Sequence, residues 1–266
     1  MNDPIKENLN YDFMDSFHDY GFPHSLWRYQ HRCRMEVIDN LSQKYSNTNS
    51  SVLDAGAGKG PVSFFLIDKV KKVITVEFDK KNAERIEFNF KNKNKESKLN
   101  LLQADLKDLS EIKDSFDLII CSEVLEHIDD YQTALSELIR LLKENGKIVL
   151  SMPNVISSFW LYDMFIYYVV KIVRKIKGKE PQGGYSFWER SRHWSFSSKK
   201  IRNIMIQNNL KIVEEKATSF LFFSDWIYKL FCFDRNFLRS HKLEKYLSSK
   251  LPRLSGTYFL VVEKIK

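Results

Sequence analysis

Three carboxylate side chains each end a short apolar run in this sequence. They are Asp54, Glu77 and Asp105. Apolar runs of this kind are typical of parallel strands, and the carboxyl ends of such strands meet at one edge of a sheet, where ligands bind. Asp54 would attract an ammonium group and repel a pyrophosphate. Glu77 lies where an acidic residue accepts hydrogen bonds from ribose hydroxyls.

Glycines follow the first of these carboxylates at alternate positions. Gly56, Gly58 and Gly60 separate Asp54 from the apolar segment 62–67. Glycines at this spacing let a strand turn tightly into a helix and let a ligand approach bare backbone. Nicotinamide, flavin and adenosylmethionine sites all use such a turn, so the glycines alone do not choose among them. The preceding carboxylate disfavours the first two, which carry a pyrophosphate.

With Asp54 in place, the stretch resembles the D/E-x-G-x-G-x-G signature of class I S-adenosylmethionine-dependent methyltransferases. It is similar to ubiquinone-biosynthesis O-methyltransferases and to methyltransferases of types 11 and 12. The resemblance covers residues 50–155 closely and 190–266 loosely, and it implies that Asp105 binds the adenine amino group, although Asp105 could also cap a helix. The cofactor-binding residues that it implies are Asp54, Ala55, Gly56, Gly58, Gly60, Glu77, Phe78, Asp105, Leu106 and Ser122.

A second group of reactive side chains follows the fourth apolar run. On a helix, Glu123, Glu126 and His127 would share one face, which suits a divalent ion such as Mg²⁺ or Mn²⁺ acting as a Lewis acid. This E-x-x-E-H motif is similar to one associated with metal binding in ubiquinone-biosynthesis and small-RNA 2′-O-methyltransferases, and the resemblance implies His193 as a further ligand. Alternatively, Glu123 and His127 are catalytic without a metal, His127 as a general base or hydrogen-bonding group, or His127 is a structural histidine at a helix start.

The order of elements predicts the sheet that positions these residues. Four strand–helix units and a further strand fill residues 52–154, which predicts an α/β, doubly wound, mostly parallel sheet. Two later strands, at 210–213 and 257–263, raise the total to seven, and the family resemblance implies that they pair antiparallel at the sheet edge. We expect the helix at 131–142 to end at Gly146.

The domain boundaries follow from where this pattern stops. Residues 1–50 are expected to form an N-terminal helical lid, and 51–155 with 191–266 the methyltransferase domain. Residues 156–190 would be an aromatic insertion after the fifth strand, because they have no counterpart in the family that the chain resembles. The insertion would be helical, because an apolar face there lies opposite a polar stripe. Such a helix can lie in a membrane interface or pack over the active site as a lid. Residues 220–239 repeat this composition.

Charge and cysteine content limit the partners and the compartment. Residues 1–150 have a net charge of −4 and residues 151–266 of +12. The second half of the chain would therefore meet an anionic partner such as a phospholipid or RNA. Alternatively, its charges only keep the protein soluble. The three cysteines Cys33, Cys121 and Cys232 show no pairing pattern, and no basic-then-apolar leader opens the chain. We therefore expect a cytoplasmic protein, for which a membrane surface is one candidate partner and internal packing of the aromatic segments is the alternative.

Together these features favour one function over two others. The first is O-methyl transfer from S-adenosylmethionine to an amphiphilic or lipid-linked small molecule. The second is 2′-O-methylation of RNA, which the basic second half would support, although no RNA-binding module is visible. The third is a catalytically silent, cofactor-binding partner subunit, which would not need all three acidic strand ends. Neither the acceptor nor the oligomeric state follows from the sequence.

Overall fold

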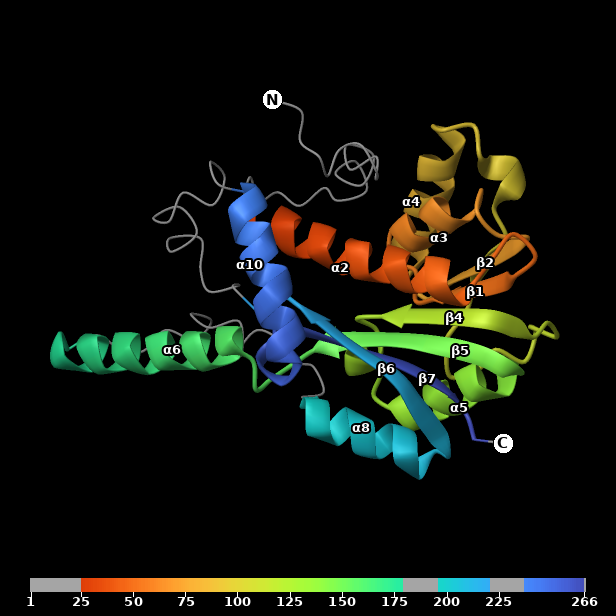
Figure 1. Cartoon of the computed structure of the whole chain (residues 1–266). Helices are drawn as coiled ribbons and strands as arrows, with labels where there is room; N and C mark the ends of the chain where they lie inside the picture. Colours follow the sequence, from red (N-terminus) through yellow and green to blue (C-terminus); the bar gives the residue numbers. More distant parts are fainter. Residues whose placement is uncertain (1–24, 179–195, 221–236, 266) are drawn as a thin grey trace.

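A seven-stranded sheet forms the centre of the molecule (Figure 1). The computed structural model describes residues 25–178, 196–220 and 237–265. The strand order is β3-β2-β1-β4-β5-β7-β6, and β7 runs antiparallel to both of its neighbours. This confirms the predicted mostly parallel sheet with an antiparallel pair at its edge. The strands are β1 (Ser51–Ala55), β2 (Lys72–Glu77), β3 (Leu101–Gln103), β4 (Phe116–Ser122), β5 (Leu142–Pro153), β6 (Leu210–Thr218) and β7 (Thr257–Lys264).

Helices cover both faces of this sheet, as expected for a doubly wound fold (Figure 1). One face carries α2 (Ser25–Tyr45), α3 (Pro61–Leu66) and α4 (Lys80–Lys91). The opposite face carries α5 (Tyr131–Leu141) and α8 (Ser198–Gln207). Helix α10 (Phe237–Lys250) lies beside α2 next to β6, whereas α6 (Ser158–Ile176) extends away from the body. Short 3₁₀ turns occupy Glu96–Lys98, Leu125–His127 and Pro252–Leu254.

The central strand β4 separates two hydrophobic cores. Leu118 and Ile120 pack with the α2, α3 and α4 side, while Ile119 and Cys121 pack with the α5 and α8 side. Because successive strand residues point to opposite faces, a strand covered on both sides has a continuous apolar sequence. The described part of the predicted lid also contributes to the core. Its helix α2 buries three apolar side chains against the sheet, namely Met35, Ile38 and Leu41.

The helix predicted to end at Gly146 ends earlier, so this expectation was wrong. Helix α5 ends at Leu141, and β5 already begins at Leu142. Gly146 lies inside that strand, where an added Cβ would lie 2.8 Å from the backbone oxygen of Phe116. The glycine therefore permits a close approach of two strands and does not terminate a helix.

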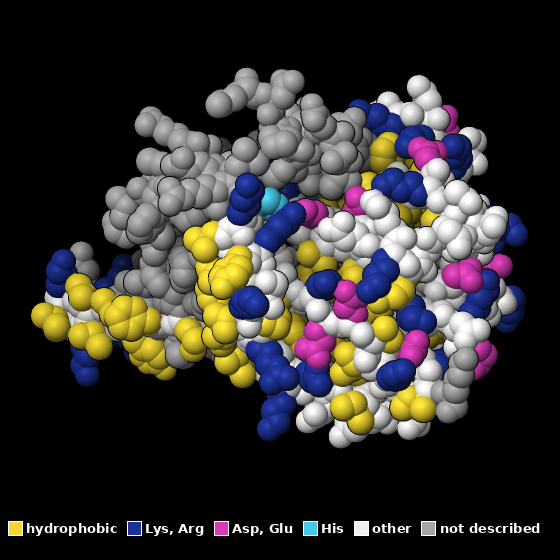
Figure 2. Space-filling view, in the orientation of Figure 1, with side chains coloured by type: hydrophobic (Ala, Val, Ile, Leu, Met, Phe, Trp, Pro, Cys, Tyr) yellow, Lys and Arg dark blue, Asp and Glu magenta, His cyan; other side chains and the backbone are white. Residues whose placement is uncertain are grey.

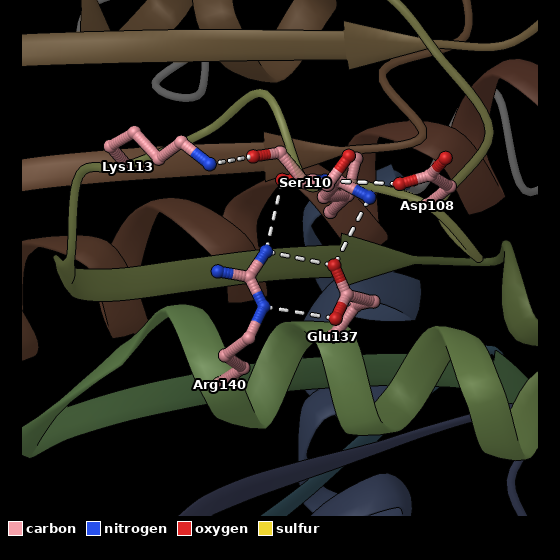
Figure 3. Close-up of polar contacts among 6 residues, drawn as sticks. Asp108, Ser110, Lys113, Glu137 and Arg140 are labelled. Atoms are coloured by element: carbon pink, nitrogen blue, oxygen red, sulfur yellow. Dashed lines mark hydrogen bonds and ion pairs between the residues drawn. The ribbon is translucent and has the colours of Figure 1, made fainter.

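The loop between β3 and β4 is fastened to α5, which positions the residues after Asp105 (Figure 3). The Glu137 carboxylate accepts a hydrogen bond from the backbone N–H of Leu109 at 3.1 Å, and the Arg140 guanidinium donates to the carbonyl of Leu109 at 2.9 Å. Arg140 also pairs with Glu137 at 2.8 Å. The hydrogen bonds to Arg140 hold the pKa of the Glu137 carboxyl below its ordinary value, so both partners keep their charges at neutral pH.

Helix α6 confirms that a helix follows β5, while its role as an insertion stays a prediction. Among the described residues, the helices are all too short or too polar to serve as a membrane-crossing segment. The aromatic segment expected at 220–239 falls largely outside the described residues, as does most of 177–195.

Candidate active site

The glycine turn after β1 has the conformation that its sequence predicts. Gly56, Gly58 and Gly60 all have positive φ, at 76°, 60° and 84°. The backbone N–H groups of Gly56 and Ala57 donate to the carbonyl oxygen of Val76 on the next strand, each at 2.9 Å. An added Cβ at Gly58 would meet no atom within 4 Å, so bare backbone faces open space there. A ligand can therefore lie directly against this turn.

Glu77 at the end of β2 holds this turn in place. One of its carboxylate oxygens accepts a hydrogen bond from the Gly58 N–H at 2.6 Å, and the other accepts from the Asp79 N–H at 2.9 Å. Each oxygen retains a second lone pair, so the carboxylate can still accept from a hydroxyl donor. The adjacent Phe78 side chain is 69% exposed, which leaves an aromatic face beside the carboxylate.

Asp54 is buried beneath the turn. Its carboxylate accepts hydrogen bonds from the Ser63 N–H at 2.9 Å and the Ser63 hydroxyl at 2.6 Å, and Thr75 donates to the same hydroxyl. Burial raises the pKa of Asp54 to about 6, because the hydrogen bonds from Ser63 offset only part of the cost of desolvating the charge. Asp54 thus joins β1 to α3, and direct contact with an ammonium group stays a prediction.

Asp105 and Leu106 lie in the loop after β3. The Asp105 side chain accepts a hydrogen bond from the Lys107 N–H at 2.9 Å and pairs with the Lys107 ammonium at 3.4 Å. No helix follows Asp105 before β4, so its alternative reading as a helix cap was wrong. Leu106 is buried. The three acidic residues thus lie at or just after the carboxyl ends of three adjacent strands, β1, β2 and β3.

The end of β4 carries the second group of predicted residues. The Ser122 hydroxyl contacts that of Ser151 on β5 at 2.8 Å. Glu123 adopts φ +58°, an uncommon conformation for a residue with a side chain, and its carboxylate pairs with Arg34 of α2 at 3.0 Å. Strained backbone of this kind concentrates at functional sites. The pair brings the N-terminal helix to the carboxyl end of the sheet.

The E-x-x-E-H segment does not form the α-helix that we expected. Only a 3₁₀ turn over Leu125–His127 is present, so Glu123, Glu126 and His127 do not share a helical face. His127 is exposed, whereas Glu126 is buried, and neither of its carboxylate oxygens has a hydrogen-bond partner among the described residues. Burial and the nearby Glu123 carboxylate raise the pKa of Glu126 well above its ordinary value. Both causes favour the protonated form of Glu126 over the charged one.

The expected metal ligands are not brought together in the part of the chain that the structure describes. Within it, no three His, Cys, Asp or Glu side chains form a group suited to a metal ion. His193 lies outside the described residues. Three further site residues, Arg34, Ser63 and Ser151, carry no sequence signal of their own, because only the fold brings them to the strand ends.

These features define a class I methyltransferase, and comparison with known proteins agrees. A family model described as a methyltransferase domain matches residues 26–215. The chain belongs to this family and is an S-adenosylmethionine-dependent methyltransferase.

Among proteins of known function, it is similar to the ubiquinone biosynthesis O-methyltransferase of Rickettsia typhi, at 23% identity over 216 residues and 80% of each chain. It is also similar to the demethylmenaquinone methyltransferase of Oceanobacillus iheyensis, at 26% identity over 221 residues, 80% of this chain and 88% of that one.

Solved structures show the same fold at low sequence identity. The magnesium protoporphyrin IX methyltransferase from Synechocystis with bound SAH matches with a TM-score of 0.57 and 15% identity, over 98% of this chain and 96% of that chain. An S-adenosylmethionine-dependent methyltransferase from Clostridium acetobutylicum matches with a TM-score of 0.53 and 13% identity, over 99% and 95%.

The residues at the strand ends fit S-adenosylmethionine, whose methyl group is carried on a positively charged sulfur. Bare backbone at Gly58 leaves room for the cofactor, and Glu77 offers acceptors for hydroxyl groups. The loop residue Asp105 and the exposed ring of Phe78 flank the same strand ends. These residues would bind and orient the cofactor, while the strand end at Glu123 would face the acceptor.

Proposed function

We propose that this methyltransferase transfers the methyl group to a hydroxyl of an amphiphilic or lipid-linked small molecule that it collects at an anionic membrane surface. The observation that carries the proposal is the exposed apolar face of α6. Two relatives support the acceptor class, since one is named for ubiquinone biosynthesis and the other for demethylmenaquinone methylation. No comparable observation favours RNA as the acceptor.

The apolar face of α6 is continuous along the helix. Its side chains recur at the spacing of one helical stripe and are 40–79% exposed; they are Leu161, Phe165, Tyr168, Val169, Ile172, Val173 and Ile176. Figure 2 shows hydrophobic side chains gathered along α6 and onto the neighbouring surface at α10, with Lys and Arg side chains at the edges. Contiguous exposed apolar side chains of this kind are typical of an interaction site.

Basic side chains around this face favour an anionic membrane. Lys171 and Lys175 in the distal half of α6, and Lys177 directly after its end, are exposed. A helix with an apolar face and basic edges lies in the interface plane of a bilayer, where each basic residue near anionic lipid contributes about 1 kcal/mol. The helix would hold the strand ends close to a substrate dissolved in the membrane.

The chemistry at the strand ends requires little beyond positioning and proton removal. The sulfonium is already activated, so the protein must align the acceptor oxygen and accept its proton. The exposed imidazole of His127 is our candidate base. Glu123, fixed by Arg34, would position the acceptor beside it.

Transfer of labelled methyl groups into separated lipid, small-molecule and RNA fractions of cell extract tests the acceptor class. We expect label in the lipid or small-molecule fraction and a loss of at least tenfold in H127Q with unchanged adenosylhomocysteine binding. Label confined to RNA would contradict the proposal, and transfer to no fraction would favour a silent partner subunit.

Sedimentation with vesicles of anionic phospholipid tests the membrane surface separately. We expect Ile172→Glu to reduce binding strongly, because it places a charge on the apolar face of α6. Ile206→Glu on α8 is a matched control, since the two isoleucines are 58% and 57% exposed. Equal binding by both variants, or no binding by the wild type, would remove the membrane from the proposal.

A further inference from the structure

A cysteine, a histidine and a glutamate form a chain of contacts between α2 and α10, outside the methyltransferase site. The Sγ atom of Cys33 lies 3.8 Å from Nδ1 of His241, and Nε2 of His241 lies 3.2 Å from a carboxylate oxygen of Glu36. Cys33 and Glu36 share one face of α2 because they are three residues apart. One imidazole therefore bridges a thiol and a carboxylate, which is the arrangement that activates nucleophiles.

Two carboxylates and an ammonium group lie beside His241. The carboxylate of Glu36 also pairs with the ammonium of Lys245 on α10. Burial raises the pKa of Glu36, but its contact with the His241 imidazole and its hydrogen bond from Lys245 outweigh the effect of burial and leave the pKa below its ordinary value, so Glu36 stays charged. A second carboxylate, Glu244, is buried in the same cavity.

The thiol lies at a small cavity that limits what can reach it. Cys33 is 4% exposed and lines a cavity of about 60 Å³ together with Glu36 and His241. That volume has room for a few water-sized molecules. The cavity adjoins a groove of about 610 Å³ between α2, β6 and α10, with which it shares wall residues such as Asn40 and Ser248. We expect a small uncharged molecule to reach the thiol from this groove more readily than a bulky reagent.

We propose that Cys33, His241 and Glu36 form an activated thiol site that reacts with small hydroperoxides. The sulfur attacks one peroxide oxygen, so that an S–O bond forms and the O–O bond breaks. Cysteine is oxidised to sulfenic acid, while hydrogen peroxide is reduced to one molecule of water or an alkyl hydroperoxide to one molecule of the alcohol. The proton that left the thiol passes from His241 to the departing hydroxide or, for an alkyl hydroperoxide, to the departing alkoxide. Glu36 stabilises the imidazolium until that transfer.

The position of Cys33 links this site to methyl transfer. The next residue, Arg34, pairs with Glu123 at the end of β4. An added oxygen on Cys33 must be accommodated in the small cavity between α2 and α10, and it also removes the contact between thiol and imidazole. Both changes act on the helix that holds Arg34. This part of the inference builds on the role of Glu123 proposed above, while the reactivity of the thiol does not.

Peptide-resolved thiol loss tests the reactivity. The full-length protein is treated with hydrogen peroxide at several pH values, quenched, unfolded, labelled with iodoacetamide and analysed by mass spectrometry. We expect Cys33 to be oxidised at least tenfold faster than Cys121 at pH 6.5, with a half-maximal rate below pH 7 instead of near the ordinary thiol pKa of about 8.5. Cys121 is a matched buried thiol whose pKa is raised by burial.

Two variants distinguish activation from simple exposure. H241Q should slow Cys33 oxidation at pH 6.5 at least tenfold and move the half-maximal rate to higher pH, whereas Lys242→Gln removes a neighbouring exposed charge and should change neither. A variant that unfolds would instead speed the oxidation of both cysteines. An unchanged pH profile in H241Q, or equal rates for Cys33 and Cys121 in the wild type, would overturn the proposal.

Discussion

Replacement of Gly56 by alanine gives the sharpest test of the turn that cradles the cofactor. Gly56 has φ +76°, and an added Cβ would lie 2.6 Å from both Cγ atoms of Val124. The left-handed backbone costs an alanine about 1–2 kcal/mol, and forcing a methyl group into packed side chains costs about 1–3 kcal/mol more. We therefore expect Gly56→Ala to lower the free energy of unfolding by about 2–5 kcal/mol.

Gly58→Ala is the matched control for this substitution. Its φ of +60° imposes the same backbone cost, but its added Cβ would meet no atom within 4 Å. We expect a loss of only about 1–2 kcal/mol in the free energy of unfolding. The methyl group would nevertheless occupy the open space beside the turn, so adenosylhomocysteine binding should weaken at least tenfold. The two alanines thus separate packing beneath the turn from ligand space above it.

Urea unfolding and calorimetric titration measure both effects. In a Val124→Ala background, Gly56→Ala should lower the free energy of unfolding only by the cost of the left-handed backbone, because the two clashing Cγ atoms are gone. Equal destabilisation by Gly56→Ala and Gly58→Ala would refute the close approach to Val124. So would a cost of Gly56→Ala that is unchanged when Val124 is truncated.

Three further predictions follow from the contacts of single residues. Because the folded-state pKa of Asp54 is raised to about 6 from 3.8, ionisation of Asp54 destabilises the native state as pH rises. In urea unfolding, the free energy of unfolding of Asp54→Asn should therefore rise by up to about 3 kcal/mol relative to that of the wild type between pH 4 and 7. A difference that does not change with pH would contradict this. Glu77→Gln replaces one of the two charged oxygens that accept hydrogen bonds from the N–H groups of Gly58 and Asp79. Calorimetry should therefore show the affinity for adenosylhomocysteine reduced roughly ten- to a hundredfold. An unchanged affinity would exclude Glu77 from positioning the turn and binding the cofactor. The Ser197 hydroxyl caps α8 by accepting a hydrogen bond from the Lys200 N–H at 3.1 Å, so Ser197→Ala should lower the free energy of unfolding in urea by about 1 kcal/mol. An equal loss for an exposed mid-helix serine, as in Ser136→Ala, would argue against capping.

The parts of the fold that sequence predicts are those where local chemistry and global packing agree. Asp54 and Glu77 end strands as their apolar runs indicate, and the glycines between them adopt the left-handed backbone that only glycine tolerates cheaply. Gly146 shows the converse. In sequence, a glycine after a helical run is typical of a helix end, and only the approach of Phe116 on a neighbouring strand reveals its packing role.

The candidate site was less predictable because its contacts cross the fold. Glu123, Glu126 and His127 have helical spacing, yet the chain leaves β4 through a left-handed residue and a short 3₁₀ turn. The partner of Glu123 is Arg34, which lies 89 residues earlier in the chain. Nothing local distinguishes that arginine from other surface basic residues, so its role follows only from the packing of α2 on the sheet.

The place of β7 between β5 and β6 also determines when the sheet can close. About a hundred residues separate the end of β5 from the start of β7, although the two strands share a long register from Ile148–Val262 to Pro153–Thr257. During synthesis on the ribosome, β5 is an open edge until the last strand emerges, and open edges invite pairing between chains. Folding of this half of the molecule is therefore a late event, and nascent chains lacking β7 are the species most exposed to aggregation.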